Sequence, residues 1–182
     1  MSISEQILID EATLRQRVGE MATEIAADTP IDRPLSVLAV MDGAFVFCAD
    51  LVRRLPAPVH LAFVRVASVD RGGVPSAVEI PEGFPVAGAD LLVIEDILDT
   101  GKTLAALRRR LEALAPSRLR IAVLLDKPSR RSEQVEVDFT GFTVEDRWVV
   151  GYGLDWKGLH RNLPYISFVD NSSGLCRLNL GK

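Results

Sequence analysis

Short aliphatic runs alternate with amphipathic stretches along this chain, and this alternation limits its fold more than any other feature. Four runs have the length and apolar content of buried strands, namely residues 35–41, 59–68, 91–95 and 118–126. Apolar residues at helical spacing begin after Asp10, Asp42 and Thr103. Strands that alternate with helices indicate an α/β fold with a mainly parallel central sheet flanked by helices.

The rest of the chain fits one domain. Two late strands are predicted at 147–153 and 165–170, after a polar connection at 127–139. The 182 residues, 48% apolar and 25% charged, suffice for one core, so we expect a single domain over residues 1–182. The glycines and prolines of residues 69–88 follow no sustained period, which predicts a long loop or a short, poorly paired hairpin, and this segment is the candidate for a flexible lid.

Composition excludes several partners. The net charge is −4 and the lysines and arginines are scattered, so we expect no nucleic acid partner, and any anionic ligand must be held locally. The two cysteines, Cys48 and Cys176, do not suggest a disulfide framework. The first residues carry acids where a signal peptide needs a basic region, and no apolar run has the length of a membrane span. These features predict a soluble, cytoplasmic protein without membrane contact.

Polar residues follow directly on the predicted strands. Asp42 follows the first strand, Glu95, Asp96 and Asp99 lie at the end of the third, and Asp126–Lys127 end the fourth. In open α/β sheets, ligands gather at the carboxyl ends of the strands. This shared position predicts a binding site there.

The stretch Asp99–Thr103 has the composition of a phosphate site. Gly101 permits close approach of a ligand, and the backbone N–H groups of a turn that opens a helix bind phosphate. An ordinary turn capped by Thr100 or Thr103 is the alternative. A nucleotide-binding P-loop fails on spacing, because Asp96 stands where its first glycine is required. The adjacent acids Glu95 and Asp96 are costly to crowd together unless ribose hydroxyls or a divalent metal binds them.

The segment VIEDILDTGKTL resembles the phosphoribosyl-diphosphate signature of the type I phosphoribosyltransferases, and within these the hypoxanthine-guanine phosphoribosyltransferases. Four further segments occur in that family's order: DGAFVFCADLVRRL, LLDKPSRR, VEVDFTGFTVEDRWVVGYGLDW and HRNLPYI. The resemblance implies the fold of that family, with a small hood. It also implies purine salvage, in which hypoxanthine or guanine and 5-phosphoribosyl 1-diphosphate give IMP or GMP and diphosphate, with Mg2+ as cofactor.

The resemblance also implies roles for the acids and the phosphate loop. Glu95 and Asp96 would hold the ribose hydroxyls, directly or through magnesium. Asp99 would take the proton from purine N7 while N9 attacks the anomeric carbon. The residues implied to surround the 5-phosphate are Asp99, Thr100, Gly101, Lys102 and Thr103.

On the purine side, Lys127 matches the cation that contacts the 6-oxo group, and Trp148 the aromatic residue that stacks on the base. Val149 matches the position whose backbone contacts the base edge. Asp155 matches a carboxylate beside the purine that binds a second magnesium or its waters, and Arg161 the arginine that holds diphosphate. Taken alone, Lys127 could equally be a solvated turn lysine, and Trp148 a core aromatic residue of a strand.

Two residues depart from the family pattern. The loop after the first strand carries Asp42 where Lys or Arg is usual, and Val69 stands where the family has tyrosine. An acid beside a diphosphate is unfavourable. We therefore predict that backbone N–H groups of Asp42, Gly43 and Ala44 hold the diphosphate while the Asp42 side chain faces solvent or a neighbouring subunit. The loss of the tyrosine predicts a less tightly sealed site.

Two other functions stay open at this stage. One is a non-catalytic regulator that binds nucleotide on the same fold. The other is a phosphoribosyltransferase for another purine, such as xanthine or adenine, although the ammonium of Lys127 can only donate a hydrogen bond and so favours a 6-oxo group. The resemblance implies a homodimer or homotetramer.

Overall fold

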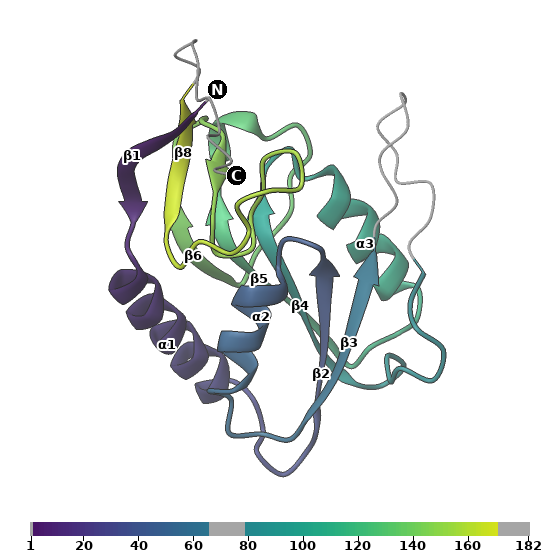
Figure 1. Ribbon diagram of the computed structural model, residues 1–182. Helices are drawn as coiled ribbons and strands as arrows, with labels where there is room; N and C mark the ends of the chain where they lie inside the picture. Colours follow the sequence, from purple (N-terminus) through teal and green to yellow (C-terminus); the bar gives the residue numbers. More distant parts are fainter. Residues whose placement is uncertain (1, 66–78, 171–182) are drawn as a thin grey trace, which may run out of the picture.

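The structure is a computed structural model that describes residues 2–65 and 79–170 (Figure 1). Five parallel strands form its central sheet in the order β3-β2-β4-β5-β6. Their bounds are β2 Leu35–Met41, β3 Val59–Arg65, β4 Asp90–Leu98, β5 Arg118–Asp126 and β6 Phe139–Thr143. The predicted α/β class with a mainly parallel sheet is confirmed.

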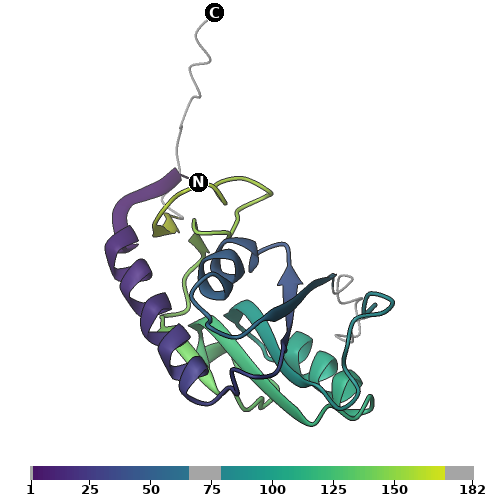
Figure 2. The same cartoon turned by 90° about the horizontal axis from the view of Figure 1, so that it is seen from below.

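Helices cover both faces of this sheet, as the view from below makes plain (Figure 2). The helices α1, Glu11–Ala27, and α2, Phe45–Val52, lie on one face, and α3, Lys102–Glu112, lies on the other. In β2, Val37 packs into the core under α1 and α2, whereas Leu38 packs into the core under α3. A central parallel strand covered on both faces needs apolar residues at almost every position, which explains why residues 35–41 are apolar except for Ser36.

A second, smaller sheet forms the hood. Its antiparallel strands lie in the order β1-β8-β7, with bounds β1 Ser2–Ile9, β7 Val149–Val150 and β8 Ile166–Asp170. The late strands predicted from the sequence therefore belong to this sheet. Ile9, Ile166 and Phe168 join the core beneath α1 and α2, so hood and central sheet share one apolar cluster.

The strand β4 is longer than predicted. The acids at Glu95 and Asp96 suggested that it ends there, but pairing with β5 continues through Ile97 and Leu98. Backbone hydrogen bonds to a neighbouring strand therefore carry the chain past the acids. Glu95 and Asp96 lie within the strand rather than beyond its end.

The predicted lid, residues 69–88, is too long at its C-terminal end. Val86 is buried, and Ile80 and Phe84 pack against the core under α3. The N-terminal part of that segment, including Val69, lies outside the described residues. Among the described residues, no helix is both long and apolar enough to cross a membrane.

Candidate active site

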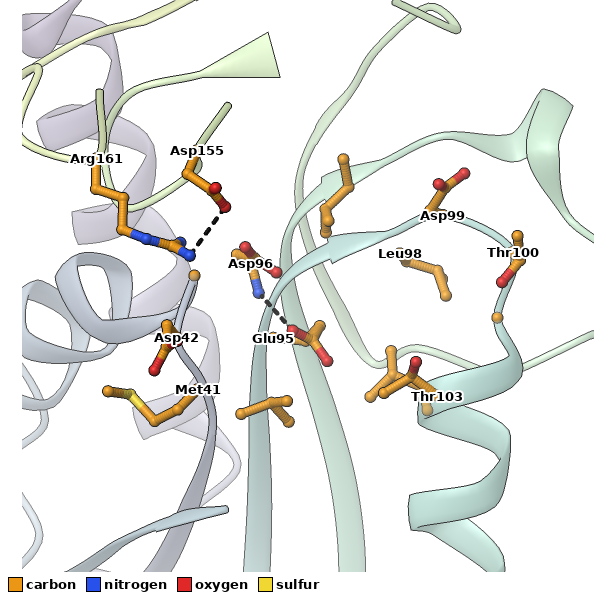
Figure 3. A pocket seen from close by; sticks show the side chains of 15 residues that line it. Met41, Asp42, Glu95, Asp96, Leu98, Asp99, Thr100, Thr103, Asp155 and Arg161 are labelled. Carbon is orange, nitrogen blue, oxygen red and sulfur yellow. Dashed lines mark hydrogen bonds and ion pairs between the residues drawn. The ribbon is translucent and has the colours of Figure 1, made fainter. Parts of the chain in front are cut away.

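The carboxyl ends of β2 and β4 open into a cavity of about 340 Å³ (Figure 3). The loop after β2 forms one wall, the end of β4 and the start of α3 form another, and the segment that follows β7 closes the third. Its polar lining consists of Asp42, Gly43, Glu95, Asp96, Asp99, Thr100, Gly101, Thr103, Asp155 and Arg161. Ten of the predicted site residues thus meet at the edge of the sheet where the sequence placed the site.

The N-terminus of α3 and the turn before it form one wall of this cavity. Gly101 precedes the helix with φ of +85°, and no side chain caps it. The Thr100 carbonyl accepts hydrogen bonds from the N–H groups of Ser132 and Glu133, at 2.9 and 3.0 Å. These bonds hold the turn before α3 against the segment that follows β5. A Cβ at Gly101 would lie 2.3 Å from the Glu133 carbonyl oxygen, so only glycine fits.

The first N–H groups of a helix have no intrahelical partner, and Thr103 and Leu104, in the first turn of α3, line the cavity. Phosphates bind such N-termini because the N–H groups and the helix dipole both favour negative charge. The alternative of a turn capped by a threonine side chain is wrong.

Two neighbouring carboxyl groups, the buried Glu95 and the partly buried Asp96, line the cavity beside the turn before α3. Glu95 is 7% exposed, and its Oε1 accepts a hydrogen bond of 3.3 Å from the Asp96 N–H. Burial and the nearby Asp96 carboxylate raise the pKa of Glu95 well above its usual value. Burial likewise raises the pKa of Asp96, although Arg161 opposes that shift.

The loop after β2 approaches Asp96 closely. A Cβ on Gly43 would lie 1.5 Å from Asp96 Oδ2, so any side chain at position 43 would displace the Asp96 carboxylate. Across the cavity, Arg161 Nη2 lies 2.9 Å from Asp155 Oδ1, and its Nη1 donates to the Gly153 carbonyl at 2.7 Å (Figure 3). Asp155 also accepts from the Gly158 N–H at 2.6 Å.

A smaller cavity of about 180 Å³ adjoins the first. Lys127 lines it and is 6% exposed, and its Nζ donates to the Arg147 carbonyl at 2.7 Å. Burial lowers the pKa of Lys127. The alternative of a solvated turn lysine is therefore wrong.

The aromatic residue of this cavity is Trp148. It is 55% exposed, its Nε1 donates to the Asp155 carbonyl at 3.0 Å, and it meets Trp156 edge to face at 4.8 Å between ring centroids. Trp148 is thus not a core residue, whereas its neighbour Val149 is buried beneath the cavity. An exposed indole beside a buried cation suits a flat, polar heterocycle.

Three acids line both cavities: Asp96, Asp99 and Asp155. Asp99 lines the larger cavity with Thr100 and Gly101, and it lines the smaller cavity with Lys127 and Trp148. One carboxylate therefore reaches both halves of the site, as a group that acts on a bond between two substrates must.

Comparison with known proteins identifies the family. Residues 5–157 match the phosphoribosyl transferase domain. The hypoxanthine-guanine phosphoribosyltransferase of Staphylococcus epidermidis is 38% identical over 89% of this chain and 92% of its own length, and that of Aquifex aeolicus is 37% identical over 91% and 95%. This chain belongs to the hypoxanthine-guanine phosphoribosyltransferase family.

Solved structures agree with this assignment. The crystal structure of a hypoxanthine-guanine phosphoribosyltransferase from Bacillus anthracis has a TM-score of 0.85 and 34% identity, and covers 93% of this chain and 100% of that one. A hypoxanthine phosphoribosyltransferase of Trypanosoma cruzi, studied for the effect of its C-terminal region on oligomeric state and activity, has a TM-score of 0.85 at 32% identity and covers 93% of each chain. The predicted family and enzyme class, a phosphoribosyl transferase, are confirmed.

Within this phosphoribosyltransferase, one predicted site residue lies apart. Lys102 lines neither cavity, although its backbone opens α3 beside the phosphate loop. The Asp42 side chain is half-exposed, and its Oδ1 lies 3.1 Å from Arg65 Nη2. The Met41–Asp42 peptide bond is cis.

Sequence reasoning missed Arg130. Its Nε lies 2.8 Å from Asp99 Oδ1, and its Nη1 lies 3.6 Å from Asp146. Its neighbour Arg131 donates to the Asp99 carbonyl at 2.7 Å and pairs with Asp126. The two arginines stand in the quoted segment LLDKPSRR, but no spacing rule shows that they would reach back to the turn after β4.

Proposed function

We propose that this phosphoribosyltransferase joins hypoxanthine or guanine to the phosphoribosyl group of 5-phosphoribosyl 1-diphosphate and releases IMP or GMP with diphosphate. Purine N9 forms a bond to the anomeric carbon, the bond from that carbon to the diphosphate oxygen breaks, and the N7 proton passes to Asp99. The observation that carries the proposal is that Asp99 lines both the larger and the smaller cavity.

The larger cavity takes the ribose 5-phosphate in this proposal. The backbone around Gly101 and the hydroxyls of Thr100 and Thr103 receive the phosphate at the N-terminus of α3. Glu95 and Asp96 face the ribose hydroxyls, whose O–H groups donate to carboxylates. The raised pKa values of Glu95 and Asp96 reflect burial of their carboxyl groups. In this assignment the ribose hydroxyls donate hydrogen bonds to these carboxyl groups.

Magnesium fits the same acids. Among the described residues, no group of three or more His, Cys, Asp or Glu side chains forms a ready cage for a metal ion. Mg2+ commonly binds through one or two carboxylates and completes its shell with water and substrate phosphates, so Glu95 and Asp96 suffice for one ion. Asp155, already held by Arg161, would contact a second ion through water. When bound, magnesium neutralises the departing diphosphate.

The smaller cavity takes the purine. Trp148 offers a flat surface for stacking, and the Lys127 ammonium lies within the same walls. Because an ammonium only donates hydrogen bonds, Lys127 selects an acceptor such as the 6-oxo group of hypoxanthine, guanine or xanthine over the 6-amino group of adenine. Donation to that oxygen draws electron density from the ring and makes N7 more acidic, so a carboxylate can serve as the base.

Arg161 completes the site on the diphosphate side. Its guanidinium lines the larger cavity beside Asp155 and points toward Asp96 (Figure 3). Charge develops on the leaving diphosphate as the ribose becomes cationic, and a fixed guanidinium stabilises that charge. The backbone N–H groups of Asp42 to Ala44 are the second diphosphate contact that we propose.

We further propose a single-domain, cytoplasmic, homo-oligomeric protein, a dimer or a tetramer. One apolar cluster shared by hood and central sheet supports the single domain, and the buried, unpaired Cys48 suits a reducing compartment. Light scattering measures the subunit number.

A product assay tests the proposed reaction. Purified protein with phosphoribosyl diphosphate and magnesium is supplied in turn with hypoxanthine, guanine, xanthine and adenine, and nucleotide is quantified by chromatography. We expect IMP and GMP, no AMP, and loss of most activity in Lys127→Met, which keeps the length of the side chain. A regulator without catalytic activity would yield no nucleotide from any base, and that result would contradict the proposal.

A further inference from the structure

The larger cavity carries an excess of negative charge for a site that binds an anion. Of its described lining residues, one is basic, Arg161, and five are acidic: Asp42, Glu95, Asp96, Asp99 and Asp155. Arg161 is also shared, because it contacts both Asp155 and the Gly153 carbonyl. In the proposed function, magnesium and Arg161 are the positive charges assigned to the diphosphate.

A second arginine, Arg65, contacts Asp42 in the wall of this cavity. Arg65 ends β3 and pairs in register with Met41 of β2, so it lies at the same carboxyl edge of the sheet as the Asp42 loop. Its Nη2 lies 3.1 Å from Asp42 Oδ1. The Arg65 side chain is 79% exposed and that of Asp42 is 50% exposed. An ion pair this exposed contributes little to the free energy of unfolding. A gain in stability therefore does not explain why Arg65 and Asp42 are paired.

We propose that Arg65 binds the diphosphate of phosphoribosyl diphosphate and that Asp42 positions its guanidinium. The inference rests on the proposed function. A guanidinium has five N–H donors in a planar fork, so one edge can bind Asp42 while another binds a phosphate oxygen. The ion pair thus replaces, from the neighbouring strand, the positive charge that Lys or Arg at position 42 would provide.

This arrangement also explains why an acid is tolerated at position 42. Alone, the Asp42 carboxylate would repel a diphosphate held by the adjacent backbone N–H groups. Paired with Arg65 it is neutralised, and the pair leaves the remaining guanidinium donors for the ligand. Asp42 is therefore a positioning residue, and Arg65 is the ligand contact.

The test measures binding of magnesium diphosphate by calorimetry and the KM values for phosphoribosyl diphosphate and hypoxanthine. Arg65→Ala should weaken diphosphate binding about tenfold and raise the KM for phosphoribosyl diphosphate similarly. The KM for hypoxanthine and the unfolding midpoint should not change. Arg65→Lys should recover part of the affinity. Arg110→Ala, which removes an exposed arginine at the far end of α3, is the matched control and should match the wild type.

A double substitution separates Arg65 from a general charge effect. In an Asp42→Lys background the loop again has its own cation, so adding Arg65→Ala should change diphosphate affinity less than twofold. Equal affinity of Arg65→Ala and wild type, or the same tenfold loss in both backgrounds, would overturn the inference. Failure of the wild type to form IMP would instead contradict the proposed function, whatever the diphosphate affinities show.

Discussion

Glu95 has a buried carboxyl group, and the folded protein disfavours its charged form. It is almost fully buried beside Asp96, and both burial and that neighbour raise its pKa. Such a group binds a proton more tightly in the folded state than in the unfolded chain. Since the folded state then holds more protons, the free energy of unfolding falls as pH rises from the unfolded pKa, about 4.3, toward the folded one. At neutral pH the buried carboxylate of Glu95 therefore lowers the free energy of unfolding.

The substitution Glu95→Gln separates the effect of Glu95 on stability from its effect on activity. It keeps the shape of the side chain and removes the buried charge, so we expect the variant to be more stable than wild type at pH 8 by about 1–2 kcal/mol, with little difference near pH 4. It should also lose most transferase activity. Urea unfolding at the two pH values measures the effect, and a variant less stable than wild type at pH 8 would refute it.

Most residues of the larger cavity could be predicted because they are consecutive or nearly so. Glu95 to Thr103 are local in sequence, and a strand, a turn and a helix fix where their backbones point. The ion pairs Asp99–Arg130 and Asp42–Arg65 join residues 31 and 23 positions apart, and no periodicity encodes such contacts. Lys102 belongs to the same motif but lines neither cavity, and the sequence pattern does not distinguish it from its neighbours in this respect.

Among the elements, α3 and its preceding turn form the proposed phosphate site. Gly101 must adopt a positive φ and must lie against the Glu133 carbonyl, so Gly101→Ala adds both strain and a clash. We expect it to lose about 2–4 kcal/mol of stability and to raise the KM for phosphoribosyl diphosphate at least tenfold. Thermal unfolding and initial rates check this.

Gly83→Ala is the matched control for that variant. Gly83 also has a positive φ, +78°, but nothing lies within 4 Å of the added Cβ. We expect a loss of about 1 kcal/mol and unchanged kinetics. If the two alanine variants behaved alike, packing of the turn against Glu133 would not matter.

The elements that the sequence predicted are those with a strong apolar pattern. The strands β2, β4 and β5 and the helices α1 and α3 were predicted because both faces of the sheet are covered and each helix has an apolar stripe. The strands β1 and β6 were not predicted. Each lies at the edge of its sheet, and β1 contains Glu5 and Gln6, so their pairing with β8 and β5 defines them more than their own residues do.

Over the whole molecule, stability and function lie at opposite edges of the sheet. Arg120, which is 1% exposed, donates two hydrogen bonds of 2.8 Å to Asp90 at the start of β4 and one of 3.0 Å to Thr29 after α1. This cluster joins the α1 side of the molecule to the amino-terminal edge of the sheet. The site lies at the carboxyl edge.

Asp90→Ala should therefore reduce stability without changing the chemistry. It leaves a buried guanidinium without its carboxylate, so we expect a loss of about 3–5 kcal/mol, whereas Glu112→Ala at an exposed pair with Arg108 should cost less than about 1 kcal/mol. Denaturant titration measures both. Activity per folded molecule should stay at the wild-type level, and a specific loss of kcat in Asp90→Ala would contradict this separation.

The central claim is that Asp99 acts as the base between the two cavities, and Asp99→Asn tests it most directly. The amide keeps the size of the side chain but is a far weaker proton acceptor. We predict that kcat for IMP formation falls about 10²- to 10⁴-fold, while phosphoribosyl diphosphate and IMP bind within a few-fold of the wild-type affinities. Wild-type kcat in Asp99→Asn would contradict the claim, as would a loss fully explained by weaker binding.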